Sequence, residues 1–181
     1  MPALLQCHRL SHSVGTKSLF QKLDLTIQSG DRIGLVGHNG SGKSTLLSIL
    51  DGTEQADAGD LARNGELRLE TVEQFINPRL LDFTLLEALL DKLPEDEKTT
   101  SRYRADQLLS QLGFTETESG FLVKDLSGGQ HNRLMFARAV MPDPNLILFD
   151  EPTNHLDLMT LLMIETFLKE MRAGFLIISH D

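Results

Sequence analysis

The sequence predicts an α/β fold in which helices cover a parallel sheet on both faces. The strongest indication lies in the second half of the chain, where the continuous apolar runs 146–149 and 175–178 flank a segment with helical spacing, 158–172. A strand that is apolar along its whole length is typical of a parallel sheet with both faces buried. A glycine-rich loop, residues 37–44, separates a strand from a helix and indicates the same architecture.

The first third of the chain predicts three strands and one helix. The strands are apolar or alternating segments separated by Gly, Ser and Asp, namely 3–8, 23–27 and 32–36. The helix begins at Gly42 and ends at the Asp-Gly pair 51–52, because glycine commonly follows the last helical residue. Its apolar stripe consists of Leu46, Leu47, Ile49 and Leu50.

The middle of the chain predicts one strand followed by a small helical subdomain at about 78–140. Residues 66–72 alternate like a strand. Helical spacing is found in three further segments, namely 85–93, 102–112 and 133–140. The acidic run 95–97 follows a proline and is expected to be a solvated loop.

Composition indicates one soluble globular domain spanning residues 1–181. The chain has 181 residues, of which 40% are hydrophobic and 24% charged, and no apolar run reaches the roughly 18 residues of a membrane helix. Without a signal-peptide pattern, a cytoplasmic location is expected. The single cysteine, Cys7, predicts a reduced thiol in a strand. The net charge of −9 opposes non-specific nucleic-acid binding, so no direct DNA binding is expected.

The glycine-rich loop fits the Walker A pattern and predicts a phosphate-binding site. Its sequence is Gly37, His38, Asn39, Gly40, Ser41, Gly42, Lys43 and Ser44. Glycines let successive backbone N–H groups converge on phosphate oxygens, and the helix N-terminus adds a partial positive charge. Lys43 is expected to contact the β- and γ-phosphates, and the Ser44 hydroxyl is expected to bind Mg²⁺. The His38 side chain either contacts the nucleotide or is a solvated loop residue.

The apolar run that begins at residue 146 ends in two acids, Asp150 and Glu151. This is the form of a Walker B segment. Asp150 is expected to hold Mg²⁺ through water, and Glu151 to orient or activate the attacking water.

Residues 126–130, Leu-Ser-Gly-Gly-Gln, place a serine and two glycines before a helix and predict a second anion site with free N–H groups. The pentapeptide is identical to the signature motif of the ATP-binding cassette (ABC) family, which the chain resembles over essentially its whole length. The resemblance implies an ABC-type P-loop nucleotide-binding domain with a parallel core sheet, an antiparallel β subdomain and a small helical subdomain. It also implies Mg²⁺-dependent ATP hydrolysis by two such domains that sandwich ATP head to tail.

Three further positions match the family: Gln74 resembles the Q-loop glutamine, Asp157 the D-loop aspartate and His180 the switch histidine. The resemblance implies catalytic roles for Lys43, Glu151 and His180, and Mg²⁺ binding by Ser44, Gln74 and Asp150. The full set of expected nucleotide contacts is Gly37, His38, Asn39, Gly40, Ser41, Gly42, Lys43, Ser44, Thr45, Gln74, Ser127, Gly129, Gln130 and Asp157.

The sequence departs from the family at two places. An aromatic residue that stacks on adenine is usual before the Walker A loop, but Val14 occupies that position here, with His12 as a weaker substitute. Members of the family also continue past the switch histidine, whereas this sequence stops at Asp181, and we expect a C-terminal truncation.

Residues 151–157, with Asn-His at positions 154–155, resemble the ABC-F subfamily, whose members carry two cassettes and often act on ribosomes. The expected partners are therefore a second ABC domain and the ribosome. The alternative is the ATPase subunit of a membrane transporter, in which a groove near Gln74 and residues 77–86 would receive a helix of the permease. A scaffold that has lost hydrolysis is a third possibility, against which the intact Lys43, Asp150, Glu151 and His180 argue.

Overall fold

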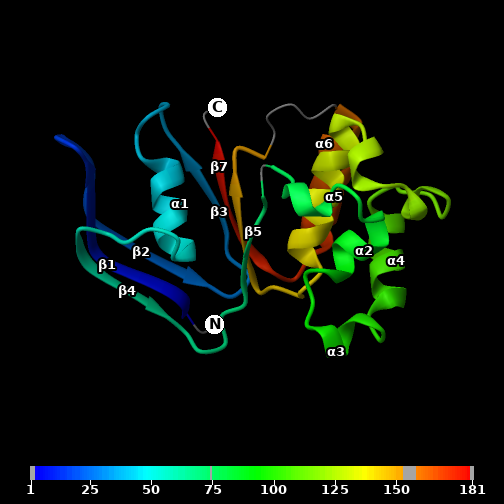
Figure 1. Ribbon diagram of the computed structural model, residues 1–181. Helices are drawn as coiled ribbons and strands as arrows, with labels where there is room; N and C mark the ends of the chain where they lie inside the picture. The colour runs from blue at the N-terminus through cyan, green and yellow to red at the C-terminus, as the bar shows by residue number, and fades with distance from the viewer. Residues whose placement is uncertain (1–2, 74, 153–157, 180–181) are drawn as a thin grey trace. The chain divides into compact units, whose positions relative to one another are not determined.

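The computed structural model describes residues 3–73, 75–152 and 158–179 (Figure 1). The chain divides into two compact units. Unit 1 consists of residues 1–71, 144–152 and 172–181, and unit 2 consists of residues 72–143 and 153–171.

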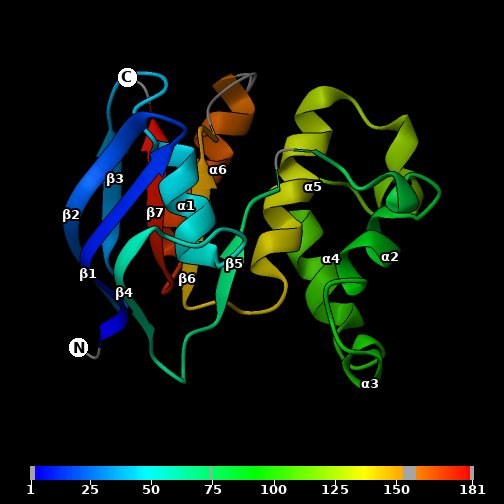
Figure 2. The same ribbon diagram turned by 60° about the vertical axis from the view of Figure 1, so that its left-hand side comes forward.

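Unit 1 contains two sheets with a helix between them. The antiparallel sheet has the order β2-β1-β4, formed by β1 (Ala3–Val14), β2 (Lys17–Gln28) and β4 (Ala58–Arg63). The parallel sheet has the order β3-β7-β6-β5, formed by β3 (Arg32–Val36), β5 (Leu69–Thr71), β6 (Leu146–Asp150) and β7 (Gly174–Ser179). Helix α1 (Lys43–Asp51) lies between the two sheets (Figure 2).

The core of unit 1 forms where α1 meets both sheets. All four residues of the predicted apolar stripe of α1 are buried. Buried residues of both sheets join them, and on the parallel strands these are alternate residues, because strand side chains two apart share a face. The contributing strand residues are Leu4, Leu5, Cys7, Leu10, Ile27, Leu146, Leu148, Leu176 and Ile178. Burial raises the pKa of the Cys7 thiol to about 11, so this thiol is protonated at neutral pH.

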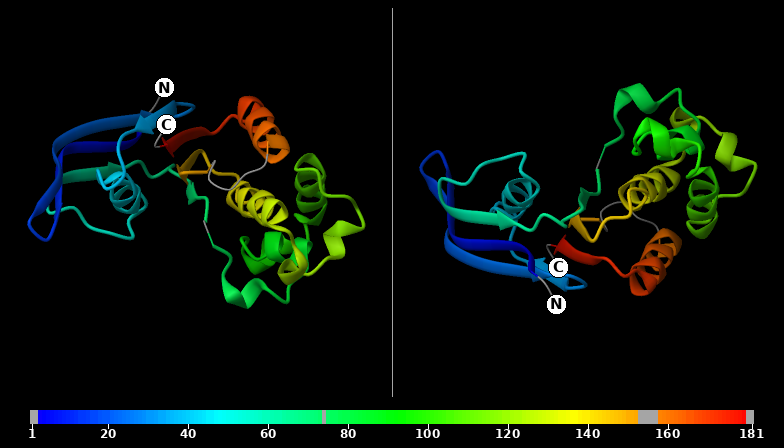
Figure 3. Two further views of the ribbon diagram at one scale, coloured as in Figure 1. Left: turned by 90° about the horizontal axis from the view of Figure 1, so that it is seen from above. Right: turned by 90° about the horizontal axis from the view of Figure 1, so that it is seen from below.

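Unit 2 is helical. Its helices are η1 (Pro78–Leu80), α2 (Leu85–Leu90), α3 (Glu95–Lys98), α4 (Arg102–Gln111), η2 (Glu118–Gly120), η3 (Val123–Asp125), α5 (Gly128–Val140) and α6 (Leu158–Glu170). Helix α5 packs against α2, α4 and α6 (Figure 3). Phe136 and Phe167 form an edge-to-face pair across α5 and α6, with ring centroids 5.3 Å apart.

The predicted α/β class and parallel sheet are confirmed, and four local predictions need correction. Strands β1 and β2 extend to Val14 and Lys17, well beyond the predicted 3–8 and 23–27. The predicted strand 66–72 shortens to β5. Strand β4 was not predicted, because its residues are mostly small or polar and exposed. The acidic run 95–97 forms the short helix α3 and not a loop, since Pro94 is at its N-terminus and acidic side chains favour a first helical turn.

Burial on both faces applies to β6 but not to β3. Residues Leu146–Phe149 are all buried, whereas β3, an edge strand, alternates between half-buried and exposed side chains, with Val36 63% exposed. Among the residues that the structure describes, no helix combines the length and the apolar character needed to cross a bilayer.

Candidate functional site

The loop between β3 and α1 has a backbone that requires glycine. Gly40 and Gly42 have φ angles of 73° and 93°, and Gly42 is the N-cap of α1. A Cβ atom at Gly37 would lie 3.3 Å from Ser41 Oγ, inside the concave side of the loop. A side chain at position 37 would therefore crowd Ser41 and Lys43, and glycine keeps the backbone N–H groups accessible to an anionic ligand.

The Lys43 ammonium lies within this loop. The residue is 9% exposed, and Nζ donates to the backbone oxygens of Gly37 at 2.7 Å and His38 at 3.2 Å. These carbonyls satisfy a buried cation that would otherwise be costly. An ammonium group held beside the N-terminus of a helix is suited to a polyphosphate.

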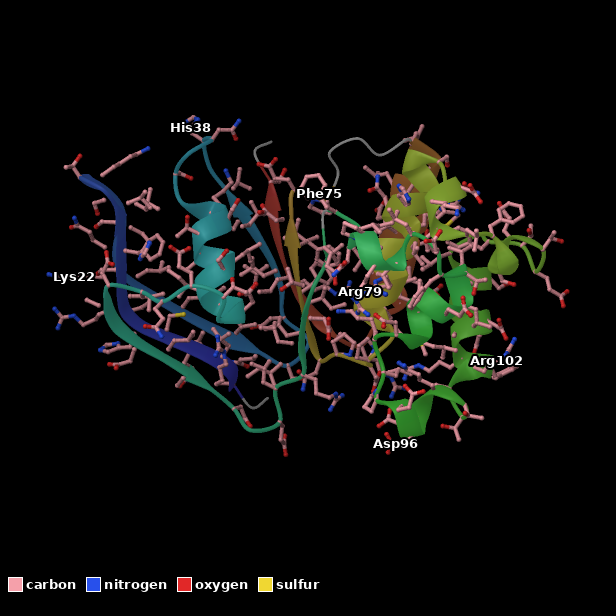
Figure 4. The ribbon with its side chains drawn as sticks, in the orientation of Figure 1. Lys22, His38, Phe75, Arg79, Asp96 and Arg102 are labelled. Atoms are coloured by element: carbon pink, nitrogen blue, oxygen red, sulfur yellow. The ribbon has the colours of Figure 1, made fainter. Side chains whose placement is uncertain are left out.

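The other predicted residues of the loop surround Lys43 at different depths. His38, Asn39, Gly40, Ser41 and Ser44 are exposed, and Thr45 is half-buried. Figure 4 places His38 at the end of the loop, away from the body of α1.

The two acids Asp150 and Glu151 lie at the same edge of the parallel sheet as the loop. Val36 pairs with Ser179, and Asp150 pairs with Ile178, so β3, β7 and β6 end together. The loop, the Asp150 carboxylate and the Ser44 hydroxyl therefore all lie at this edge of the sheet, within unit 1. Hydroxyl and carboxylate oxygens are the donors that Mg²⁺ prefers, so these residues fit the metal ion that the sequence predicts.

Glu151 has a left-handed backbone conformation, with φ of 47°. Its backbone N–H donates to the Ile178 oxygen at 3.1 Å, which ties the strained turn to β7. Such a conformation costs a non-glycine residue about 1–3 kcal/mol and is concentrated at functional sites. The strain is consistent with a functional requirement at Glu151.

The serine-glycine motif at 127–130 lies in unit 2 and starts α5. Ser127 is the N-cap, and a capping box joins it to Gln130: Ser127 Oγ accepts from the Gln130 N–H at 3.3 Å, and Gln130 Oε1 accepts from the Ser127 N–H at 2.9 Å. Helix α5 therefore begins at Gly128, directly after Ser127, as expected for a serine and two glycines at the start of this helix.

Sequence reasoning missed Glu118, which holds Gln130. Glu118 Oε1 accepts from Gln130 Nε2 at 2.8 Å, and Oε2 accepts from both the N–H and the hydroxyl of Thr115 at 2.8 Å each. The Thr115 backbone N–H is the main cause that lowers the pKa of the Glu118 carboxyl. The Thr-x-x-Glu spacing from 115 to 118 was the available signal.

Three predicted positions, Gln74, Asp157 and His180, lie outside the described residues. The neighbours of Gln74 are described. Glu73 lies 3.6 Å from Lys92 and 3.9 Å from the buried Arg138, and Phe75 is 84% exposed.

His12 is not a substitute for an adenine-stacking residue. Its side chain is buried between two carboxylates, with Nε2 3.1 Å from Glu54 and Nδ1 3.5 Å from Asp57. It therefore offers no open ring face to a base. Val14, at the end of β1, is 57% exposed but has no ring.

The chain matches the sequence pattern of the family described as ABC transporter over residues 20–154. It is 32% identical to the energy-dependent translational throttle protein EttA of Escherichia coli (strain K12), covering 98% of this chain and 32% of that protein. It is 30% identical to the ATP-binding protein Uup of Buchnera aphidicola, covering 99% of this chain and 30% of Uup. It is 33% identical to ABC transporter F family member 4 of Arabidopsis thaliana, covering 99% of this chain and 25% of that protein. The chain thus spans between a quarter and about a third of the length of these relatives.

Solved structures of ABC transporters share the fold. The inward-facing conformation of a putative metal-chelate type ABC transporter superposes with a TM-score of 0.83 at 26% identity, covering 100% of this chain and 74% of that one. The ADP conformation of an ATP-binding cassette of an ABC transporter superposes with a TM-score of 0.83 at 23% identity, covering 100% of this chain and 82% of that one. At this identity, the similarity shows only that the two chains share a fold.

Proposed function

The chain belongs to the ATP-binding cassette family, and from this premise we propose that it is a cassette of a cytoplasmic ABC-F protein that acts on ribosomes. Members of the family are P-loop ATPases. The observation that carries the finer assignment is the similarity to EttA, a translational throttle protein, across 98% of this chain. The Asn-His pair at 154–155 supports the same subfamily.

The residues that unit 1 contributes to the nucleotide site have distinct roles. The N–H groups of the loop and the Lys43 ammonium bind the phosphates. The Ser44 hydroxyl would bind Mg²⁺ directly and the Asp150 carboxylate would hold it through water, and the bound ion would neutralise phosphate charge. The Glu151 carboxylate accepts a proton from the attacking water, and its constrained backbone limits the positions that this group takes.

The remaining roles in the proposal come from the family. By the family resemblance, Gln74 would contact Mg²⁺ and His180 would contact the γ-phosphate. Ser127, Gly129 and Gln130 complete the nucleotide site of a second ABC domain, and Asp157 contacts that domain's Walker A loop. A single cassette therefore carries two half-sites and turns ATP over slowly by itself.

The test uses Glu151→Gln in the complete gene product. Glutamine keeps the size of the side chain and removes the proton acceptor, so ATP stays bound while hydrolysis nearly stops. We expect the variant with ATP to co-sediment with ribosomes several-fold more than the wild type, at one stated salt concentration. Glu116→Gln, an exposed glutamate of unit 2, is the matched control and should behave as the wild type. An unchanged ribosome pellet would contradict the ribosomal assignment and leave the ATPase function intact.

The ATPase subunit of a membrane transporter is the second candidate. The exposed Phe75 beside Gln74 favours it, since an apolar side chain in that position suits a permease contact (Figure 4). The same Glu151→Gln preparation distinguishes the two functions, because a transporter subunit would accumulate in a membrane complex and leave ribosome pellets unchanged.

A further inference from the structure

A second lysine contacts the Walker A loop from a different strand. Lys17 is the first residue of β2, directly after the turn that joins it to β1, where it pairs with Val14. Its Nζ donates to the Gly40 backbone oxygen at 2.8 Å. Two ammonium groups thus donate to glycine carbonyls of the loop, Lys43 to that of Gly37 and Lys17 to that of Gly40.

This approach is built into the fold. Leu19, two residues along β2, packs on Gly42 so closely that a Cβ there would lie 2.7 Å from Leu19 Cβ. Side chains two apart on a strand share a face, so one face of β2 lies against the loop. The pairing of β2 with β1 and the contact of Leu19 with Gly42 therefore bring Lys17 to Gly40.

The Lys17 ammonium is placed to bind an anion. The side chain is exposed, so solvent and ligands reach it. Lysine has three N–H donors, and the Gly40 carbonyl accepts from one of them. In a chain with a net charge of −9, a second cation at this loop has a large relative effect on the attraction of a polyphosphate.

We propose that Lys17 is a second phosphate-binding cation of the nucleotide site, in addition to Lys43. It strengthens the hold on the anionic part of the nucleotide in a chain whose Val14 offers no ring to the base. The proposal rests on nucleotide binding by residues 37–44 and deepens it, because it assigns affinity to a residue outside the Walker A motif.

The test compares the affinities of ATP, ADP and AMP for Lys17→Met by calorimetric titration of the complete gene product. A charge-assisted hydrogen bond to phosphate predicts an affinity for ATP about tenfold lower, a smaller loss for ADP and no loss for AMP. The loss should shrink at high salt, which screens the exposed ammonium. Lys17→Arg should keep the affinity for ATP within about threefold, since the charge remains.

Lys22→Met is the matched control. Lys22 also lies on β2 and is exposed, and Figure 4 shows it well away from His38 and the loop. This variant should bind all three nucleotides as the wild type does. Equal losses for ATP, ADP and AMP in Lys17→Met would overturn the proposal, because they indicate only a role in shaping the loop. Unchanged ATP affinity in that variant would also overturn it. A wild type that fails to bind ATP would instead refute the proposed function, and thermal unfolding curves separate either result from misfolding.

Discussion

Two helix N-termini of this chain carry the expected nucleotide contacts, and they differ in how their backbone N–H groups are satisfied. No side chain among the described residues caps α1, whose N-cap is Gly42 in a left-handed conformation. Helix α5 has a complete capping box, in which Ser127 and Gln130 satisfy each other's N–H groups. The first N–H groups of α1 are therefore left for a ligand, while α5 is stabilised without one.

The charged side chains near these two helix N-termini also differ. Lys43 and Lys17 contact the loop before α1, whereas the Gln130 side-chain amide at the start of α5 donates to the acidic Glu118. We infer that the two motifs have different functions. The loop of unit 1 binds the nucleotide by itself, whereas the motif of unit 2 completes the nucleotide site of another domain.

The largest expected effect is the loss of ATP affinity on substitution of Lys43. Lys43→Ala should lower ATP affinity at least about a hundredfold, or about 2.7 kcal/mol, because the buried cation of the loop is lost. Calorimetric titration measures it, with Lys22→Ala as the control. Ser127→Ala should stay within about threefold of the wild type in the same titration. A comparable loss of ATP affinity for Ser127→Ala would contradict the inference that the loop of unit 1 binds the nucleotide by itself.

Gly42→Ala should destabilise unit 1 by about 2 kcal/mol or more. The new methyl group meets Leu19, and a left-handed alanine adds strain. Gly30→Ala is the control, because Gly30 has a similar φ of 82° with open space around its Cβ position. It should cost only about 1 kcal/mol in urea unfolding. Equal losses in the two variants would show that the contact with Leu19 is unimportant.

Ser127→Ala should destabilise α5 by about 1 kcal/mol through loss of its N-cap. Thr84→Ala removes the same capping box from α2 and should cost a similar amount. Hydrolysis rates then sharpen the comparison, because only Ser127→Ala should slow ATP turnover beyond what its stability loss explains. If Thr84→Ala slows turnover equally, the Ser127 effect is structural.

The smallest expected effect concerns the base. Because Val14 has no ring and His12 is buried, competition binding should show a preference for ATP over GTP well below about a hundredfold, which corresponds to 2.7 kcal/mol. A larger preference would mean that another residue reads the base.

The sequence by itself determined the elements whose geometry is local. The loop at 37–44, α1 and the apolar run of β6 follow from glycine conformations, helix periodicity and continuous hydrophobicity, all of which act over a few residues. The order of motifs along the chain was sufficient to indicate the family, which the comparison with known proteins then showed.

Only the tertiary structure decided which distant residues meet. Strand β4 has little strand propensity of its own and exists because β1 provides a partner for its backbone. The contact of Lys17 with Gly40 spans 23 residues and depends on the pairing of β2 with β1. The burial of His12 between Glu54 and Asp57 likewise requires β1 and a remote loop to meet. Such contacts depend on packing between elements, which no local pattern encodes.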